Sequence, residues 1–115
     1  MVEVRAYATE DGKSPYRKWF GGLNAPAAVK VTTALERMED GNFSNAKPVG
    51  SGVSEYKIDF GPGYRIYFGM DGETLVILLC GGTKKRQSND IKAAQKLWTD
   101  YRARKKAEAD KGKEK

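Results

Sequence analysis

Charged and apolar residues alternate strictly along residues 55–68, the stretch of this sequence whose residue types and spacing best suit chemistry. Successive side chains of a strand point to opposite sides of a sheet, so the alternation predicts a β-hairpin with one apolar face and one polar face. A concave sheet face that carries cations attracts phosphate groups, so we expect function on the polar face. Its residues are Glu55, Lys57, Asp59, Arg65 and Tyr67.

Residues 61–63, Gly-Pro-Gly, predict the turn of this hairpin. Proline fixes φ at the first corner of a turn, and glycine supplies a positive φ at the second. This turn places Asp59 opposite Arg65 and Lys57 opposite Tyr67. The first pair has two interpretations: it belongs to a site, or it is a solvated cross-strand ion pair that contributes roughly 0.2 to 1 kcal/mol.

A second group of cations, Lys-Lys-Arg at residues 84–86, follows two glycines and a threonine. A helix is predicted directly afterwards, with Ser88 or Asn89 as its N-cap and Asp90 in its first turn. Free backbone N–H groups at a helix start add affinity for anions. Asp90 also has a purely structural interpretation, because acidic residues are favourable in a first turn.

The residue types that are missing restrict the chemistry further. Histidine is absent and Cys80 is the single cysteine. This removes Ser-His and Cys-His nucleophile pairs, and it argues against a zinc site, which uses several Cys or His ligands. No glycine-rich phosphate loop ending in Gly-Lys-Ser/Thr is present. Any catalysis must therefore use Lys, Arg, Tyr, Asp or Glu, and we expect no metal and no cofactor.

The overall charge indicates the kind of partner. The sequence has 21 Lys and Arg against 15 Asp and Glu, a net charge of +6 that favours RNA, DNA or an acidic protein. No apolar run approaches the ~20 residues of a membrane span, and the first residues lack the apolar stretch of a signal peptide. With one cysteine, the composition suits a reducing cytosol, so we expect a soluble, cytoplasmic protein.

Short-range signals predict the elements that position these residues. Residues 2–7 alternate as a short strand. Ser14 stands directly before Pro15 and Asn24 stands two residues before Pro26, and both predict the N-caps of helices, which end at Gly21 and Gly41. We interpret these helices as a hairpin that covers one face of the sheet.

The remaining segments complete the prediction. Residues 42–54 are rich in Gly, Asn, Ser and Pro and predict a loop, whereas residues 74–80 are apolar on both faces and predict a central strand. In the last helix, Trp98 and Tyr101 fit core anchors better than base-stacking groups. We therefore expect an α+β fold with a mostly antiparallel, twisted sheet and a C-terminal helix.

The end of the chain has no apolar stripe from Arg104 onward, which is typical of a frayed helix end or a disordered tail. We therefore expect one folded domain over residues 1–102 and a basic tail over residues 103–115.

The order of elements and several motifs resemble a known family. Tyr56-Lys57-Ile58, Gly63-Tyr64-Arg65-Ile66-Tyr67-Phe68, Gly81-Gly82-Thr83-Lys84 and Gln87 to Asp90-Ile91 are similar to motifs of the RelE/ParE superfamily of toxins from type II toxin–antitoxin modules. Within it, the sequence most resembles the HigB-like "addiction module killer protein" branch, which includes phage-derived Gp49-like proteins. The resemblance runs from about Val2 to Tyr101 and implies the small RelE-like fold.

This resemblance implies a ribosome-dependent mRNA endoribonuclease that needs no metal and inhibits translation. In RelE-type members, basic residues promote attack of a ribose 2′-OH on the adjacent phosphate. Arg65 and Lys84 match phosphate clamps and Lys57 matches a transition-state cation, while Asp90 and Tyr67 are the candidate proton-transfer groups. We expect RNA contacts from Lys85, Arg86, Gln87 and Lys92.

Two departures leave alternatives open. Asp59 stands where RelE members can carry a second strand lysine, and Asp90 stands near their C-terminal tyrosine. A ParE-like inhibitor of DNA gyrase and a non-catalytic RNA-binding domain share the expected fold, and fold does not decide between them. The resemblance also implies a HigA-like helix-turn-helix antitoxin as partner, with operator DNA bound only through the complex, and mRNA with ribosomal RNA as further contacts.

Overall fold

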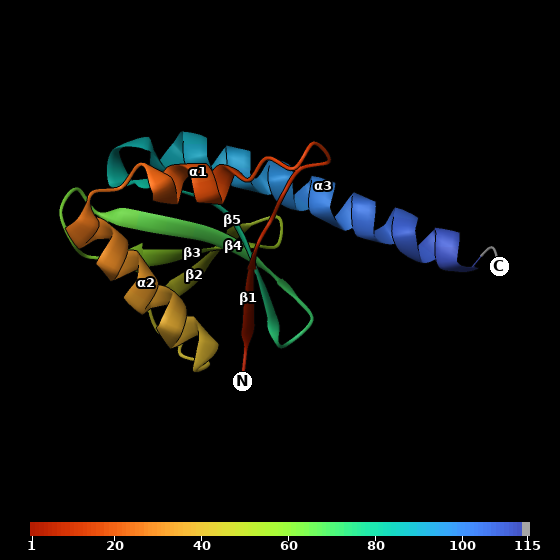
Figure 1. The fold of residues 1–115 in the computed structure, drawn as a ribbon, viewed down its shortest axis with the longest axis horizontal. Helices are drawn as coiled ribbons and strands as arrows, with labels where there is room; N and C mark the ends of the chain where they lie inside the picture. Colours follow the sequence, from red (N-terminus) through yellow and green to blue (C-terminus); the bar gives the residue numbers. More distant parts are fainter. Residues whose placement is uncertain (114–115) are drawn as a thin grey trace.

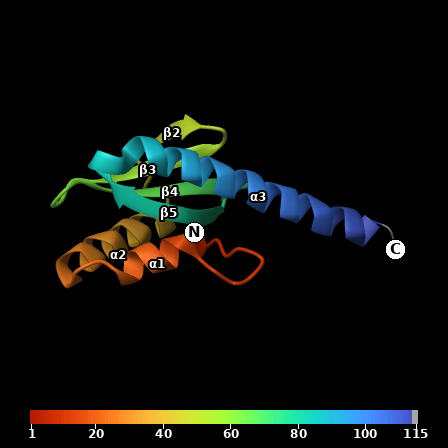
Figure 2. The ribbon, with the colours of Figure 1, turned by 90° about the horizontal axis from the view of Figure 1, so that it is seen from above.

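The computed structural model describes residues 1–113, which form a mixed sheet with helices on both faces (Figures 1 and 2). The five strands lie in the order β1-β5-β4-β3-β2. Strand β1 pairs with β5 in parallel, and the other neighbours are antiparallel. The expected α+β fold with a mostly antiparallel sheet is confirmed. The strands are β1 (Glu3–Ala6), β2 (Ala46–Gly50), β3 (Val53–Ile58), β4 (Tyr64–Asp71) and β5 (Leu75–Thr83).

Helices α1 (Pro15–Gly21) and α2 (Ala25–Glu39) cover one face of the sheet, as the sequence predicts. Both predicted N-caps are present: the Ser14 hydroxyl accepts a hydrogen bond from the Arg17 N–H, and the Asn24 side chain accepts one from the Ala27 N–H. Prolines in the first turn fit there because the first helical N–H groups have no partner within the helix.

The opposite face is covered by α3 (Gln87–Lys113), which crosses the sheet and extends beyond it (Figures 1 and 2). Each face has its own apolar core: Ile66 and Phe68 lie on the α1/α2 side, and Tyr67 and Leu79 lie on the α3 side. The central strands are therefore buried on both sides.

The predicted loop over residues 42–54 is wrong, because it contains β2 and the first residues of β3. Pro48 and the glycines look like strand breakers in the sequence. β2 is an edge strand, however, so the missing N–H of Pro48 costs no hydrogen bond. The glycines serve the turn after β2, where Gly50 and Gly52 have positive φ angles of 100° and 81°.

The predicted register of the β3–β4 hairpin is also wrong, by two residues. Lys57 pairs with Arg65 and Glu55 pairs with Tyr67, so Asp59 is not opposite Arg65. The loop is longer than predicted because the Gly63 N–H donates to the Phe60 carbonyl. A shift of two residues keeps every side chain on its predicted face.

Helix α3 also differs from its prediction at both ends. It begins at Gln87, after a 3-10 turn η1 (Lys84–Arg86), so Ser88 and Asn89 are helical residues rather than N-caps. Residues 103–113 are helical, not disordered, while residues 114 and 115 lie outside the described residues. The helix crosses the expected boundary at residue 102, and the division of the chain there stays a prediction. Within residues 1–113, no helix combines the length and apolar character needed to cross a membrane.

Candidate functional site

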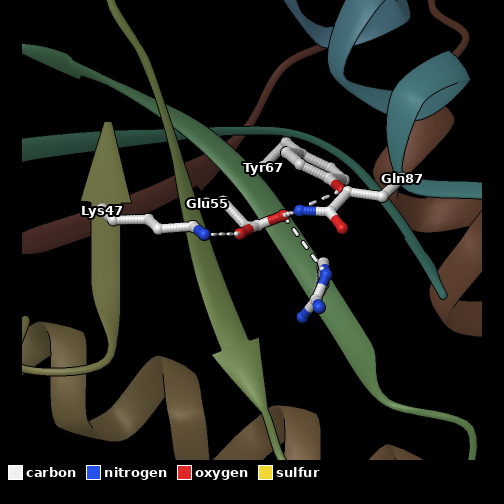
Figure 3. A network of polar contacts seen from close by, with 5 residues as sticks. Lys47, Glu55, Tyr67 and Gln87 are labelled. Atoms are coloured by element: carbon white, nitrogen blue, oxygen red, sulfur yellow. Dashed lines mark hydrogen bonds and ion pairs between the residues drawn. The ribbon is translucent and has the colours of Figure 1, made fainter. Parts of the chain in front are cut away.

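A buried carboxylate organises the polar face of the β3–β4 hairpin. Glu55 is only 1% exposed, and its Oε1 accepts hydrogen bonds from Gln87 Nε2 at 2.8 Å and from the Tyr67 hydroxyl at 3.2 Å. Arg65 Nε lies 3.3 Å from the same oxygen, and Lys47 Nζ lies 3.7 Å from Oε2. Figure 3 shows side chains from β2, β3, β4 and α3 converging on this carboxylate.

Arg65 belongs to this buried network and does not lie on an open surface. Its residue exposure is 5%, and although Nε is close to Glu55, neither Nε nor Nη1 makes a hydrogen bond. The pairing opposes the arginine charge with a carboxylate charge. The predicted cationic sheet face is therefore buried at Arg65, where the guanidinium lies beside Glu55.

Tyr67 is fully buried, and its hydroxyl donates to Glu55. Burial raises the pKa of this hydroxyl, and the nearby charge of Glu55 raises it further. A buried tyrosine with a raised pKa and a fixed acceptor holds Glu55 in place, and Tyr67 does not line the hollow beside Glu55 that is described below.

Asp90 lies in the first turn of α3, where its Oδ2 is buried without a hydrogen bond. Burial raises the pKa of the carboxyl, and the charge of Arg86 opposes this change. The carboxyl packs against the backbone of Gly82, where a Cβ would fall 1.9 Å from Oδ2. This position turns the carboxyl toward β5 and suits the structural interpretation of Asp90.

Lys57 faces the open part of the polar face. It is exposed and lines a hollow of about 390 Å³ that contains Glu55 together with residues from β2 and the preceding loop. The hollow thus combines a carboxylate with the ammonium groups of Lys47 and Lys57. Its lining residues are Ser44, Asn45, Ala46, Lys47, Glu55, Lys57 and Asp59.

Comparison with known proteins identifies the family. Residues 18–102 match the model of a family described as "Phage derived protein Gp49-like". The chain belongs to the Gp49-like family. A protein of Haemophilus influenzae described as "Uncharacterized protein" is 42% identical over 83 residues, which is 71% of this chain and 84% of the relative. The Gp49-like family is a toxin-like family of toxin–antitoxin systems.

The second group of cations in this Gp49-like chain borders the network. Lys84, Lys85 and Arg86 are exposed in the turn η1. The backbone N–H of Lys84 donates to the Gly63 carbonyl at 2.8 Å, which joins this turn to the hairpin loop. The exposed side chains of η1 therefore stand next to the start of α3, one residue before Gln87.

The other predicted RNA contacts separate into two kinds. Lys92 is exposed on α3, whereas Gln87 is half-buried and its side-chain amide is used by Glu55. Gln87 thus connects the start of α3 to Glu55 of β3 by a hydrogen bond.

Two members of this site were missed from the sequence. The alternation places Glu55 on the polar face, but nothing local indicates that four other side chains converge on it. Lys47 lies in the segment that was predicted as a loop, so its pairing across β3 could not be anticipated. The pairing of residue 47 with residue 55 appears only once β2 is recognised as a strand.

Proposed function

We propose that this Gp49-like chain is the toxin of a type II toxin–antitoxin module and cuts mRNA on the ribosome. In this proposal it belongs to the HigB-like branch of the RelE/ParE superfamily. The observation that carries the proposal is the hollow in which Lys47 and Lys57 flank the carboxylate of Glu55. A carboxylate beside cations supplies a proton acceptor and charge stabilisation, the two requirements of metal-independent RNA cleavage.

The geometry favours Glu55 as the proton acceptor. Tyr67 and Asp90 Oδ2 are buried away from the hollow, whereas Glu55 lines it. Oε1 is occupied by Gln87 and Tyr67, and Oε2 has only the more distant Lys47. Glu55 is itself only 1% exposed, so the proposal requires the exposed side chain of Lys47 to move aside and open Oε2 to a ribose hydroxyl.

The proposed reaction is attack of a ribose 2′-oxygen on the adjacent phosphorus. Glu55 Oε2 takes the 2′ proton, the bond from phosphorus to the 5′-oxygen breaks, and a 2′,3′-cyclic phosphate forms. Lys57 stabilises the charge on the phosphate and donates the proton that the leaving 5′-oxygen needs. Lys84 holds a neighbouring phosphate from η1, and Arg65 positions Glu55.

The proposed partner is a HigA-like helix-turn-helix antitoxin. The net charge of +6 complements an acidic partner surface. Operator DNA would then be bound through the antitoxin, and the free toxin would contact mRNA and ribosomal RNA.

A reconstituted translation reaction tests the activity. We expect wild type to cut message within codons, and Lys57→Ala and Glu55→Gln to cut at least about 100-fold more slowly, the usual effect of losing one acid–base group. Lys18→Ala and Glu10→Gln are matched controls, because each makes the same charge change at an exposed position that does not line the hollow. Both controls should cut like wild type. Arg65→Ala and Glu55→Gln each remove one partner of the same buried ion pair, which costs about 3 to 5 kcal/mol of stability. All variants are therefore compared at equal folded concentration, and the exposed Lys57→Ala carries the decision.

A wild-type protein that is folded and leaves ribosome-bound message intact would overturn this proposal. A supercoiling assay with DNA gyrase would then test the ParE-like alternative. Full activity in both site variants would instead show that the chemistry lies elsewhere on the surface.

A further inference from the structure

A second hollow adjoins the candidate site. It has a volume of about 290 Å³ and lies between α2 and the end of β3, on the other side of the sheet from Glu55. Both hollows are lined by Asn45, Lys57 and Asp59. Together they are called here the edge groove, because they meet at these residues on either side of β3, where its pairing with β2 ends.

The edge groove is lined by cations from three elements. Lys30 and Arg37 come from α2, Lys47 comes from β2, and Lys57 comes from β3. Among the described residues, Lys30, Arg37 and Lys57 make no ion pair. The opposing carboxylates are Asp59 and Glu55, and Glu55 is already paired with Arg65 and Lys47. The groove therefore keeps an excess of positive charge.

An aromatic ring lies at the α2 end of the groove. Phe60 lines the second hollow and is half-buried, and Lys30 Nζ lies 5.3 Å from the centre of its ring. A cationic channel with an aromatic face is the combination that holds single-stranded nucleic acid, because the cations follow the phosphates and the ring stacks on a base.

We propose that the edge groove binds the single-stranded RNA that flanks the cut bond and leads it from the hollow at Glu55 round β3 to α2. This inference rests on the proposed function and adds Lys30, Arg37 and Phe60 to the RNA-binding residues. A single strand fits this path because it can bend round the edge of a sheet. A duplex is too stiff to follow such a turn.

The salt dependence of RNA binding tests the inference. The probe is a short single-stranded RNA that carries a 2′-deoxy nucleotide only at the cut site, so that it lacks the attacking 2′-OH and stays intact. For single strands, each lost phosphate contact reduces the slope of log affinity against log salt by about 0.7. We expect Lys30→Ala/Arg37→Ala to lose about two such contacts and to bind several-fold more weakly at low salt.

Arg17→Ala/Lys18→Ala is the matched control, because it removes the same charge from exposed positions of α1 that do not line the groove. The control should keep the wild-type slope. Equal losses in both double variants would overturn the inference, since net charge alone would then attract the RNA. Wild-type behaviour of both, or no binding by wild type, would overturn it as well.

The two proposals can fail separately. Wild type that cuts message while Lys30→Ala/Arg37→Ala binds the probe normally contradicts only the edge groove. Binding through the groove without cleavage on ribosomes contradicts only the nuclease. Phe60→Leu gives a further check, because it keeps the apolar packing and removes the stacking face, and it should weaken binding without changing the salt slope.

Discussion

Glu55 determines what the neighbouring side chains of the hairpin contact. Read along the sequence, Arg65 and Tyr67 are exposed groups on a cationic face. In the structure both contact the same buried carboxylate, so they hold it in place and Lys57 remains as the exposed cation of the hairpin face. Buried polar groups are expensive unless they are paired, which explains why the network contains both charges and two hydrogen bonds.

The buried carboxyl of Asp90 makes the stability of the protein depend on pH. Burial raises its pKa above the ordinary value of 3.8. The native state then binds this proton more tightly than the unfolded state, so the stabilisation is complete below pH 3.8 and is lost as pH rises through the raised pKa. The side chain of Asp90→Asn cannot titrate. The free energy of unfolding of this variant, minus that of wild type, should therefore increase as pH rises through this window.

Urea unfolding in steps of pH from below 3.8 to neutrality measures that difference. Asp11 and Asp71 have lowered pKa values and make stability fall toward acid pH. Both residues are present in wild type and in the variant, so their contributions cancel in the difference. A difference that stays constant with pH would contradict the burial of the Asp90 carboxyl.

Two tryptophans pack the helices onto the sheet, each with its ring against a glycine of a strand. Trp19 of α1 lies against Gly81 of β5 on one face, and Trp98 of α3 lies against Gly69 of β4 on the other. A Cβ at residue 69 would fall 2.5 Å from the Trp98 ring. The sequence predicts Trp98 as a core anchor, and the structure confirms it, but the receiving glycine is on another element.

Gly69→Ala should therefore destabilise the protein by about 1 to 3 kcal/mol, the usual cost of overfilling a packed site. Gly21→Ala is the control, because nothing lies within 4 Å of a Cβ there. Its effect should stay within about 0.5 kcal/mol. Urea unfolding measures both variants, and equal effects would show that Trp98 can move aside without cost.

Helix α3 connects distant parts of the molecule. Its first residue bonds to Glu55, and its middle covers the sheet. Further along, Arg104 Nη1 donates to the Tyr7 hydroxyl at 3.0 Å and to the Ala8 carbonyl at 2.9 Å. Lys105 pairs with Asp71. The stretch that looks like a tail in the sequence thus contacts the segment after β1 and the end of β4.

A chain that ends at residue 102 tests the expected boundary. It lacks the contacts of Arg104 and Lys105 but keeps the Glu55 network, so it should fold with a loss of about 1 to 2 kcal/mol. Full-length Arg104→Ala is the control that isolates the hydrogen bonds of one residue. Urea unfolding compares the three proteins, and a shortened chain that fails to fold would place the boundary further along α3.

By itself, the sequence determined the local features of this protein: the N-caps at Ser14 and Asn24, the alternation of residues 55–68, and the side of the sheet that each residue takes. These follow from backbone geometry and need only near neighbours. The tertiary structure alone decided that α3 covers the polar face, because that packing joins residues such as Gln87 and Glu55 across 32 positions. Burial of Tyr67 and of Asp90 Oδ2 accompanies this packing of α3 on the sheet, so no local pattern could indicate it.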